Sequence, residues 1–161
     1  MRLLIVRHAE AVPANARGVS DRDRPLTANG ERAFRAAARG LARRVPAPDL
    51  LLASPLRRAQ QTAALLAAAW GGIAVTPEAA LASGSVDAIL AALATHADET
   101  TIALVGHEPT VSELLAGLVG AEARGFSPGA AALVEMTSVS RRDGHLRWYL
   151  PPEVAGQTAQ A

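Results

Sequence analysis

Four residues in three short segments have the side chains best suited to chemistry. Arg7 and His8 directly follow an apolar run, Arg58 comes soon after a second such run, and His107 closely follows a third. Guanidinium groups bind phosphate oxygens in pairs, a neutral imidazole can attack phosphorus, and a second imidazole can donate to an oxygen. Arg7 and His8 alone are equally consistent with a buried structural pair. Together with His107 and Arg58 they favour phosphoryl chemistry.

Composition excludes several other kinds of chemistry. The chain has no cysteine, which removes disulfides, cysteine-based zinc sites, iron–sulfur clusters and thiol nucleophiles. All 16 Lys+Arg residues are arginine, which removes P-loop and Schiff-base lysines. The four histidines show no metal-ligand spacing. We therefore expect no metal and no cofactor, and cationic roles fall to arginine.

Length and hydropathy bound the organisation of the chain. The 161 residues are half hydrophobic and 19% charged, which favours one folded domain. We expect that domain to cover residues 1–150, and residues 151–161, which begin with two prolines, to form a flexible tail. No apolar stretch is long enough for a membrane span or a signal peptide. The sequence therefore favours a cytoplasmic protein without a membrane partner.

Charge is distributed unevenly along the chain. Residues 1–58 hold 12 arginines and 5 acids, whereas residues 59–161 hold 4 arginines and 10 acids, so the two parts carry net charges of +7 and −6. A basic part can indicate nucleic-acid binding. The first part, however, has a single aromatic residue, Phe34, and no dense basic run, so base stacking has little support. A local anion pocket explains the asymmetry better, and we expect no nucleic-acid partner.

Apolar patterning predicts alternating strands and helices. Short apolar runs indicate buried strands, and apolar positions every three or four residues indicate helices. The expected strands cover residues 3–6, 49–53, 73–75 and 101–105, with a closing hairpin of 132–136 and 145–149. The expected helices run over 28–45, 54–70, 86–95 and 109–119, and Thr27 is the expected N-cap of the first.

This order predicts an α/β protein: a three-layer α/β/α sandwich with a mostly parallel central sheet and an antiparallel edge. In such sheets, ligands bind beyond the carboxyl ends of the strands. Arg7, His8, Arg58 and His107 lie close to predicted strand ends. We expect them to share one pocket.

Four segments, taken together, carry a family resemblance. They are Arg7–Glu10 (RHAE), Arg24–Gly30 (RPLTANG), Ser54–Thr62 (SPLRRAQQT) and Val105–Pro109 (VGHEP). In this order they resemble the histidine phosphatase (phosphoglycerate mutase-like) superfamily, and within it the small SixA-type phosphohistidine phosphatases. The resemblance covers residue 1 to about residue 150. It implies a phosphoglycerate mutase-like fold, no metal, and a covalent phosphohistidine intermediate.

The resemblance also implies individual roles. His8 matches the family nucleophile, and Arg7 matches the phosphate-binding arginine beside it. Arg58 directly precedes Ala-x-Gln-Thr and matches the second phosphate-binding arginine. Successive helical residues point about 100° apart, so the adjacent Arg57 receives a rim or structural role. His107 matches the second pocket histidine, and Arg24 matches an arginine that short SixA-like members place near the site, where it would bind substrate.

The chain departs from the family pattern at two points. Ala9 stands where the wider superfamily has glycine. Larger relatives carry an acidic proton donor after the second helix, and here residues 76–84 offer only Glu78, which matches that acid weakly. A phosphorylated imidazole needs little help to leave, because its second ring nitrogen can be protonated near a pKa of about 6.5. The missing acid therefore favours phosphohistidine over sugar phosphates.

The sequence thus predicts a cofactor-independent phosphatase with His8 as nucleophile and Arg7, Arg58 and His107 stabilising the phosphoryl oxygens. The expected substrate is phosphohistidine on a protein, such as a histidine phosphotransfer domain. One alternative is a small-molecule phosphomonoester phosphatase or mutase, which the short chain disfavours because few residues remain for a lid. Another is a non-catalytic module that binds phosphorylated proteins. That alternative would need the arginines but not both histidines.

Overall fold

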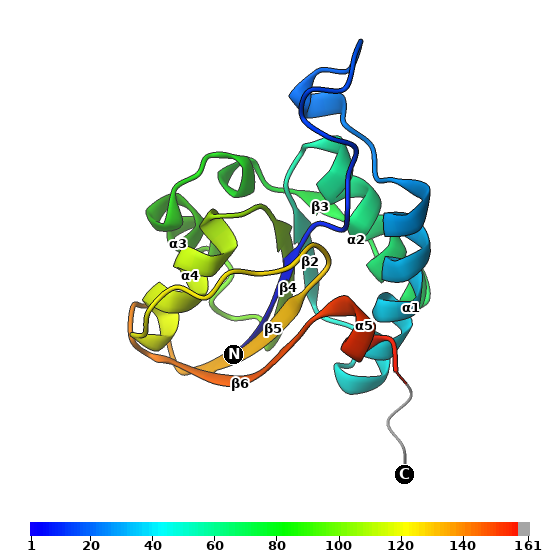
Figure 1. Cartoon of the computed structure of the whole chain (residues 1–161). Helices are drawn as coiled ribbons and strands as arrows, with labels where there is room; N and C mark the ends of the chain where they lie inside the picture. The colour runs from blue at the N-terminus through cyan, green and yellow to red at the C-terminus, as the bar shows by residue number, and fades with distance from the viewer. Residues whose placement is uncertain (158–161) are drawn as a thin grey trace.

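A single six-stranded sheet forms the centre of the molecule. The computed structural model describes residues 1–157, and its strands follow the spatial order β3-β2-β4-β1-β5-β6 (Figure 1). The strands are β1 (Arg2–Arg7), β2 (Leu50–Ala53), β3 (Thr76–Pro77), β4 (Thr101–Gly106), β5 (Ala131–Met136) and β6 (Gly144–Leu150). Strands β3, β2, β4 and β1 are parallel, and β5 runs antiparallel to both β1 and β6. The predicted parallel sheet with an antiparallel edge is confirmed.

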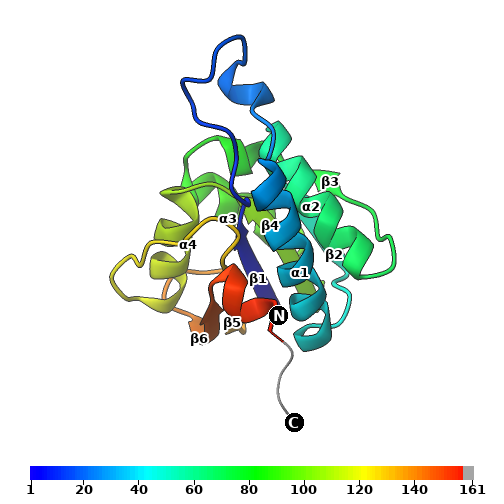
Figure 2. The ribbon, with the colours of Figure 1, turned by 45° about the vertical axis from the view of Figure 1, so that its right-hand side comes forward.

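Helices cover both faces of this sheet. The helices are α1 (Ala28–Arg44), α2 (Arg57–Ala69), α3 (Val86–Ala94), α4 (Thr110–Val119) and α5 (Pro152–Ala155), and short 3-10 helices are η1 (Asp21–Asp23) and η2 (Ala79–Ala82). Helices α1, α2 and α5 lie on one side of the sheet, and α3 and α4 lie on the other (Figures 1 and 2). The predicted three-layer sandwich is therefore confirmed.

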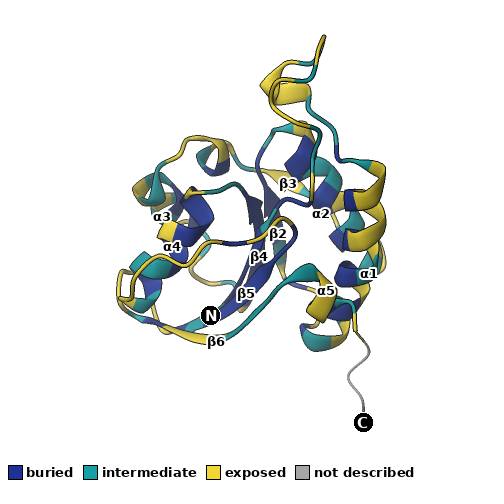
Figure 3. Cartoon of the chain, in the orientation of Figure 1, coloured by how far each residue is buried: buried dark blue, intermediate teal, exposed yellow. Residues whose placement is uncertain are grey.

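Strand β1 shows why two helical layers form. Its four central residues are fully buried (Figure 3). Successive strand side chains point to opposite faces, so Leu4 and Val6 join the core under α1 and α2, whereas Leu3 and Ile5 join the core under α3 and α4. A strand that is apolar at every position needs cover on both faces.

The strand register places the segments that carry His8, Ser54 and His107 next to one another at the ends of β1, β2 and β4. Strands β1 and β4 pair from Arg2 with Thr101 to Arg7 with Gly106, so His8 and His107 follow the same rung of the ladder. Strand β2 pairs with β4 up to Ala53 opposite Val105, and Ser54 follows directly. Residues far apart in sequence therefore leave the sheet side by side at its carboxyl edge.

Three local boundaries test the sequence patterns. The Thr27 side chain accepts from the Gly30 N–H, which confirms the predicted N-cap of α1. Helix α2 begins at Arg57 rather than at residue 54. The Ser54 hydroxyl is hydrogen-bonded to His107, and Leu56 occupies the N-cap position. The third strand lies at Thr76–Pro77 rather than at residues 73–75, because the chain that follows α2 first pairs with β2 at Thr76.

The expectation of a flexible tail over 151–161 is wrong for its first part. Pro152–Ala155 form α5, in which proline occupies the first turn, and Ala155 is fully buried against α1. The Ala155 carbonyl accepts a hydrogen bond of 3.0 Å from Arg44. Gly40 makes this approach possible, because a Cβ there would lie 1.6 Å from the Ala155 oxygen. Residues 158–161 lie outside the described part of the chain.

The segment between β1 and α1 projects from the body of the molecule and carries η1 (Figure 1). A bridge between Ala11 and Leu26 joins the two ends of this projecting segment. Within residues 1–157, no helix has the length and apolar character needed to cross a membrane.

Candidate active site

The predicted residues meet in one cavity at the carboxyl edge of the sheet. The cavity has a volume of about 250 Å³ and is more polar than apolar. Its lining residues are Arg7, His8, Glu10, Ala11, Arg24, Arg58, His107, Glu108 and Pro128. All five residues predicted for the site are among them. Three arginines around one small cavity create a site for an anion with several negative charges.

The backbone around His8 is held from three sides. The His8 N–H donates to the carbonyl of Gly106, the last residue of β4, and the His8 carbonyl accepts from the Gly129 N–H before β5. The next N–H, that of Ala9, donates to the Thr62 hydroxyl of α2 at 3.0 Å. The backbone of His8 is therefore fixed by the sheet and by one helix before any ligand binds.

The His8 ring is neutral and has a defined tautomer. Its Nδ1 lies 2.7 Å from the Ala9 carbonyl oxygen, and because that oxygen can only accept, Nδ1 carries the proton. Nε2 therefore keeps its lone pair. Burial lowers the pKa of His8 to about 3. The positive charges of Arg58 and Arg7, and repulsion by His107 when that ring is protonated, act in the same direction, although the hydrogen bond to Ala9 opposes them. The ring is unprotonated at neutral pH, and a neutral imidazole with a free Nε2 lone pair has the chemistry of a nucleophile.

His107 lies beside His8 and is also neutral. The ring centroids are 5.2 Å apart with a tilt of 53°. Burial lowers the pKa of His107 to about 4, with further contributions from Arg58, Arg24 and Arg7 that exceed the opposing effect of Asp21. Its Nε2 is 2.7 Å from the hydroxyl of Ser54, a fully buried residue that follows β2.

Arg7 is positioned by the chain that leads into β5. Its Nη1 donates to the Phe126 carbonyl at 2.7 Å. The Phe126 N–H in turn donates to the carboxylate of Glu108, which also accepts from the Ser112 hydroxyl and N–H on α4. Glu108 thus connects α4 to the segment that orients Arg7. Its carboxylate oxygens serve as acceptors in every one of these contacts.

Arg58 and Arg24 are connected through Asp21. Arg58 is 6% exposed, and its Nη1 donates to the Asp21 carbonyl at 2.8 Å. Arg24 donates from Nε to the Asp21 carboxylate at 3.0 Å and from Nη1 to the Val12 carbonyl at 2.9 Å. Although partial burial acts to raise it, the pKa of Asp21 is lowered by Arg58 and Arg24. Asp21 therefore remains ionised and holds both guanidinium groups at the cavity.

Some buried nitrogens of the site have no protein partner. Among the described residues these are Nε of Arg7, Nε of Arg58 and Nδ1 of His107, and all three residues line the cavity. Buried polar groups are nearly always hydrogen-bonded, so a cluster of unpaired ones requires an explanation. An anion in the cavity would supply acceptors for such donors.

Two other predicted positions lie apart from the cavity lining. Arg57 is exposed, and its Nη1 is 3.5 Å from the carbonyl of Asp23, the last residue of η1, so it contacts the projecting segment rather than the cavity. Glu78, the weak candidate for a proton donor, accepts from the Ala80 N–H at 3.0 Å and caps η2. The acidic residues that do line the cavity are Glu10 and Glu108.

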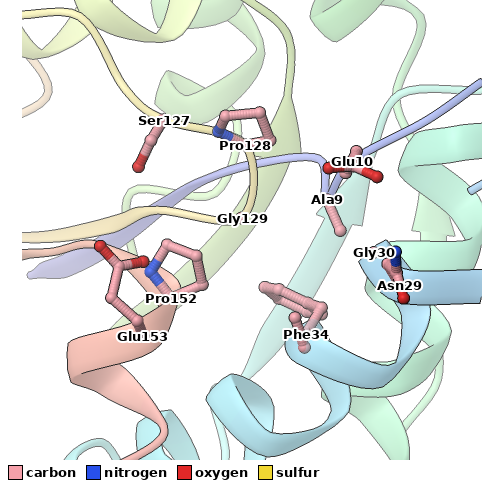
Figure 4. A pocket seen from close by; sticks show the side chains of 11 residues that line it. Ala9, Glu10, Asn29, Gly30, Phe34, Ser127, Pro128, Gly129, Pro152 and Glu153 are labelled. Atoms are coloured by element: carbon pink, nitrogen blue, oxygen red, sulfur yellow. The ribbon is translucent and has the colours of Figure 1, made fainter. Parts of the chain in front are cut away.

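A second cavity of about 300 Å³ adjoins the first (Figure 4). The two share Glu10 and Pro128. The second is mostly apolar, with Phe34, Pro128 and Pro152 among its walls and the Glu10 and Glu153 side chains on different sides of it (Figure 4). With a phosphoryl group in the first cavity, the rest of the same ligand would have room in the second cavity.

Sequence reasoning missed the residues that support the site. The sequence pattern places Ser54 at a helix start and gives Asp21 no role. The sequence marks Glu108 only as the residue that follows His107. The signal that could have identified Asp21 is its position as an acidic residue within a strongly basic segment. The contacts of Ser54 and Glu108 depend on strand order and on the path of residues 120–130, which no local pattern contains.

The fold and the cavity together define an α/β protein with a histidine and arginine site for a phosphoryl group. The family model of the histidine phosphatase superfamily (branch 1) matches residues 3–84. An uncharacterized protein of Picosynechococcus sp. is 39% identical over 116 residues, which cover 70% of each chain. The chain belongs to the histidine phosphatase superfamily, as its motifs predicted.

Solved structures of SixA proteins share this fold. The structure of the protein histidine phosphatase SixA complexed with tungstate superposes with a TM-score of 0.84 at 27% identity, over 94% of this chain and 97% of that one. A protein of Nakamurella multipartitia assigned as a phosphohistidine phosphatase SixA gives a TM-score of 0.79 at 32% identity, with coverage of 94% and 95%. A mycobacterial glucosyl-3-phosphoglycerate phosphatase shares the fold at 19% identity, with a TM-score of 0.71 and coverage of 91% and 96%.

Proposed function

We propose that this phosphatase removes phosphoryl groups from phosphohistidine on a protein, with His8 as the nucleophile. One observation carries the proposal. A neutral His8, whose Nδ1–H is engaged by the Ala9 carbonyl, keeps a lone pair on Nε2 in a cavity lined by Arg7, Arg24 and Arg58. A nucleophile of this kind needs no base to remove a proton before it attacks.

The reaction has two displacement steps. In the first, His8 Nε2 forms a bond to phosphorus while the bond from phosphorus to the substrate imidazole breaks. The leaving ring keeps the proton on its other nitrogen and departs as neutral imidazole. In the second, water attacks the phosphorus on His8, releases inorganic phosphate and restores the neutral ring. The Ala9 carbonyl stabilises the positive charge that the His8 ring carries while it is phosphorylated.

The cations of the cavity support charge stabilisation in both steps. Arg7 is held by the Phe126 carbonyl, and Arg58 is held by the Asp21 carbonyl. Both are therefore oriented before substrate arrives, and preorganised donors contribute most to transition-state stabilisation. We assign phosphoryl-oxygen binding to Arg7, Arg58 and His107, and substrate binding to Arg24.

The acidic residues support phosphohistidine as the substrate. Expulsion of an alkoxide requires a proton donor. Glu78 caps η2, and Glu108 accepts hydrogen bonds from Ser112 and Phe126. The Glu10 carboxylate accepts from the Thr27 hydroxyl at 2.7 Å. Each of these carboxylates acts as an acceptor, whereas a phosphohistidine substrate brings its own proton on the leaving ring.

A comparison of turnover rates tests the proposal. The purified chain is given a histidine-phosphorylated phosphotransfer domain, free phosphohistidine, an aryl phosphate and an alkyl phosphate. We expect kcat/KM to fall in that order. Faster hydrolysis of the alkyl phosphate would favour a small-molecule phosphatase, and binding of the phosphorylated domain without phosphate release would favour a non-catalytic binding module. Either result would overturn the proposal.

A further inference from the structure

The hydrogen bond between Ser54 and His107 lies next to the reacting groups and has a polarity that can be worked out. Ser54 is fully buried. Its N–H donates to the Val105 carbonyl, and its own carbonyl accepts from the Gln60 side chain at 2.8 Å. Its backbone groups are therefore engaged, and only the hydroxyl remains to interact with His107.

The Ser54 hydroxyl has one acceptor within reach. Its oxygen accepts from the Leu56 N–H at 3.3 Å, and Nε2 of His107 lies 2.7 Å away. In the described residues no other acceptor is hydrogen-bonded to this hydroxyl. If Nε2 carried the proton, the Ser54 oxygen would accept twice and its hydrogen would be buried without a partner, which is costly. The hydroxyl therefore donates to Nε2.

This polarity decides which nitrogen of His107 carries the proton. When Nε2 accepts, the neutral ring carries its proton on Nδ1. Nδ1 is buried and has no partner among the described residues. An Nδ1–H can donate to a phosphoryl oxygen, whereas a bare Nδ1 lone pair would repel one.

We propose that Ser54 is a positioning residue that holds His107 in its Nδ1–H tautomer, so that His107 presents a hydrogen-bond donor to the phosphoryl group. Both histidines then carry their proton on Nδ1, but different nitrogens of the two rings are engaged by the protein. Nδ1–H of His8 is engaged by the Ala9 carbonyl and Nε2 attacks, whereas Nε2 of His107 is engaged by Ser54 and Nδ1–H donates. The part played in turnover rests on the proposed function, but the tautomer does not.

Nitrogen-15 NMR of the histidine rings tests the tautomer directly. In the unmodified enzyme at pH 7, we expect His8 and His107 to show a protonated Nδ1 and an unprotonated Nε2. In Ser54→Ala, His107 should shift toward the Nε2–H form that free histidine prefers, while His8 stays unchanged as an internal reference. Ser112→Ala is the matched control, because Ser112 is another buried serine near the site but bonds to Glu108. It should leave the His107 tautomer unchanged.

Ligand binding and turnover then test the consequence. Inorganic phosphate is the probe, and its addition should move the His107 Nδ1 resonance in the unmodified enzyme more than in Ser54→Ala. We expect Ser54→Ala to lower kcat/KM about 10-fold to 100-fold, below the 10²–10³ loss that follows removal of a transition-state donor. Ser54→Thr, which keeps a hydroxyl, should recover the His107 tautomer.

Two results would overturn the inference. The first is an Nε2–H tautomer of His107 in the unmodified enzyme. The second is a Ser54→Ala variant that keeps both the Nδ1–H tautomer and full turnover. Failure of the proposed function is a different result, since an enzyme inactive on phosphohistidine would still show the Ser54-dependent tautomer and its response to phosphate.

Discussion

The main-chain carbonyl of Asp21 accepts a hydrogen bond of 2.8 Å from Nη1 of Arg58, and the Asp21 carboxylate lies 3.6 Å from Nη2 of the same guanidinium. The projecting segment after β1 thus reaches back to the first turn of α2. Within residues 1–157, Arg57 makes a single long hydrogen bond, to the Asp23 carbonyl at 3.5 Å, and its side chain is exposed. Two adjacent arginines therefore have different environments.

This difference predicts unequal effects of the two alanine substitutions. Arg58→Ala should lower kcat/KM at least 10-fold to 100-fold, because a hydrogen bond to a charged group is worth about 1.5–3 kcal/mol. Arg57→Ala should lower it less than about 5-fold, as expected for an exposed charge. Steady-state kinetics on a phosphohistidine substrate measures both. Equal losses of kcat/KM would show that Arg58 does not interact with the phosphoryl group more strongly than Arg57 does.

A covalent intermediate on His8 is the second prediction. Acid-free quenching during turnover should trap a phosphoryl adduct that is labile to acid and stable to base, and peptide mapping should place it on His8. His8→Ala should abolish both the adduct and turnover while it leaves the circular dichroism spectrum unchanged. An adduct on a serine, or none in an active preparation, would contradict the mechanism.

The lowered histidine pKa values predict a pH-dependent stability. Between about pH 4 and 6.5, His8 and His107 bind protons in the unfolded chain but remain neutral in the folded one. The unfolded state then holds more protons, so the free energy of unfolding falls as pH decreases through 6.5. Urea unfolding at pH 7 and pH 5 should show a clear loss at the lower pH.

Substitution identifies the groups responsible for that loss. His8→Asn and His107→Asn should each reduce the difference in unfolding free energy between pH 7 and pH 5. His145→Asn is the matched control, because His145 is exposed on β6, and it should leave the difference unchanged. An equal pH dependence in all three variants would assign the effect to other groups.

Close packing at Gly30 predicts that a single methyl group disturbs the site. A Cβ on Gly30 would lie 2.3 Å from the Glu10 carbonyl oxygen, two residues beyond His8. Gly30→Ala should therefore destabilise the protein by about 1–3 kcal/mol and also lower kcat. Gly40→Ala, in the same helix, meets the Ala155 carbonyl instead. It should lower stability with little change in kcat, and equal kinetic losses would contradict this separation.

The second cavity predicts discrimination between large and small substrates. Ala33 is exposed and lines this cavity, so Ala33→Trp should narrow it. Turnover of the phosphorylated domain should fall about 10-fold, whereas turnover of phosphoramidate should be nearly unchanged. Ala68→Trp on α2 is the control, because Ala68 is exposed but lines neither cavity. Loss on both substrates would show that the second cavity does not separate them.

The layered fold was predictable because its signals are local. Leu3–Val6 is apolar at every position, which is typical of a strand covered on both faces, and Thr27 before a helical period predicts an N-cap. Prediction failed where a residue serves a distant partner. Two consecutive prolines at 151–152 predict the start of a tail, yet the same prolines begin α5, because Gly40 in α1 leaves room for this helix.

The candidate site was predictable to a different extent. Its main residues follow strands, and strand ends in a parallel sheet converge, so their common location could be inferred. The direction of each hydrogen bond could not. Ser54 before a proline is typical of a helix start, and only the adjacency of β2 and β4 places its hydroxyl beside His107.

The pairing of β1 with β4 has a consequence for how this chain can vary. The ladder sets the spacing of the two histidines, because each leaves the sheet after the rung that joins Arg7 to Gly106. One inserted or deleted residue in either strand would move its histidine by about 3.3 Å and turn it to the opposite face of the sheet. Length changes should therefore be tolerated in residues 14–19, which precede Asp21 and Arg24 in the projecting segment, and in residues 120–125, but not in the strands. Among functional variants, insertions and deletions should map to those loops.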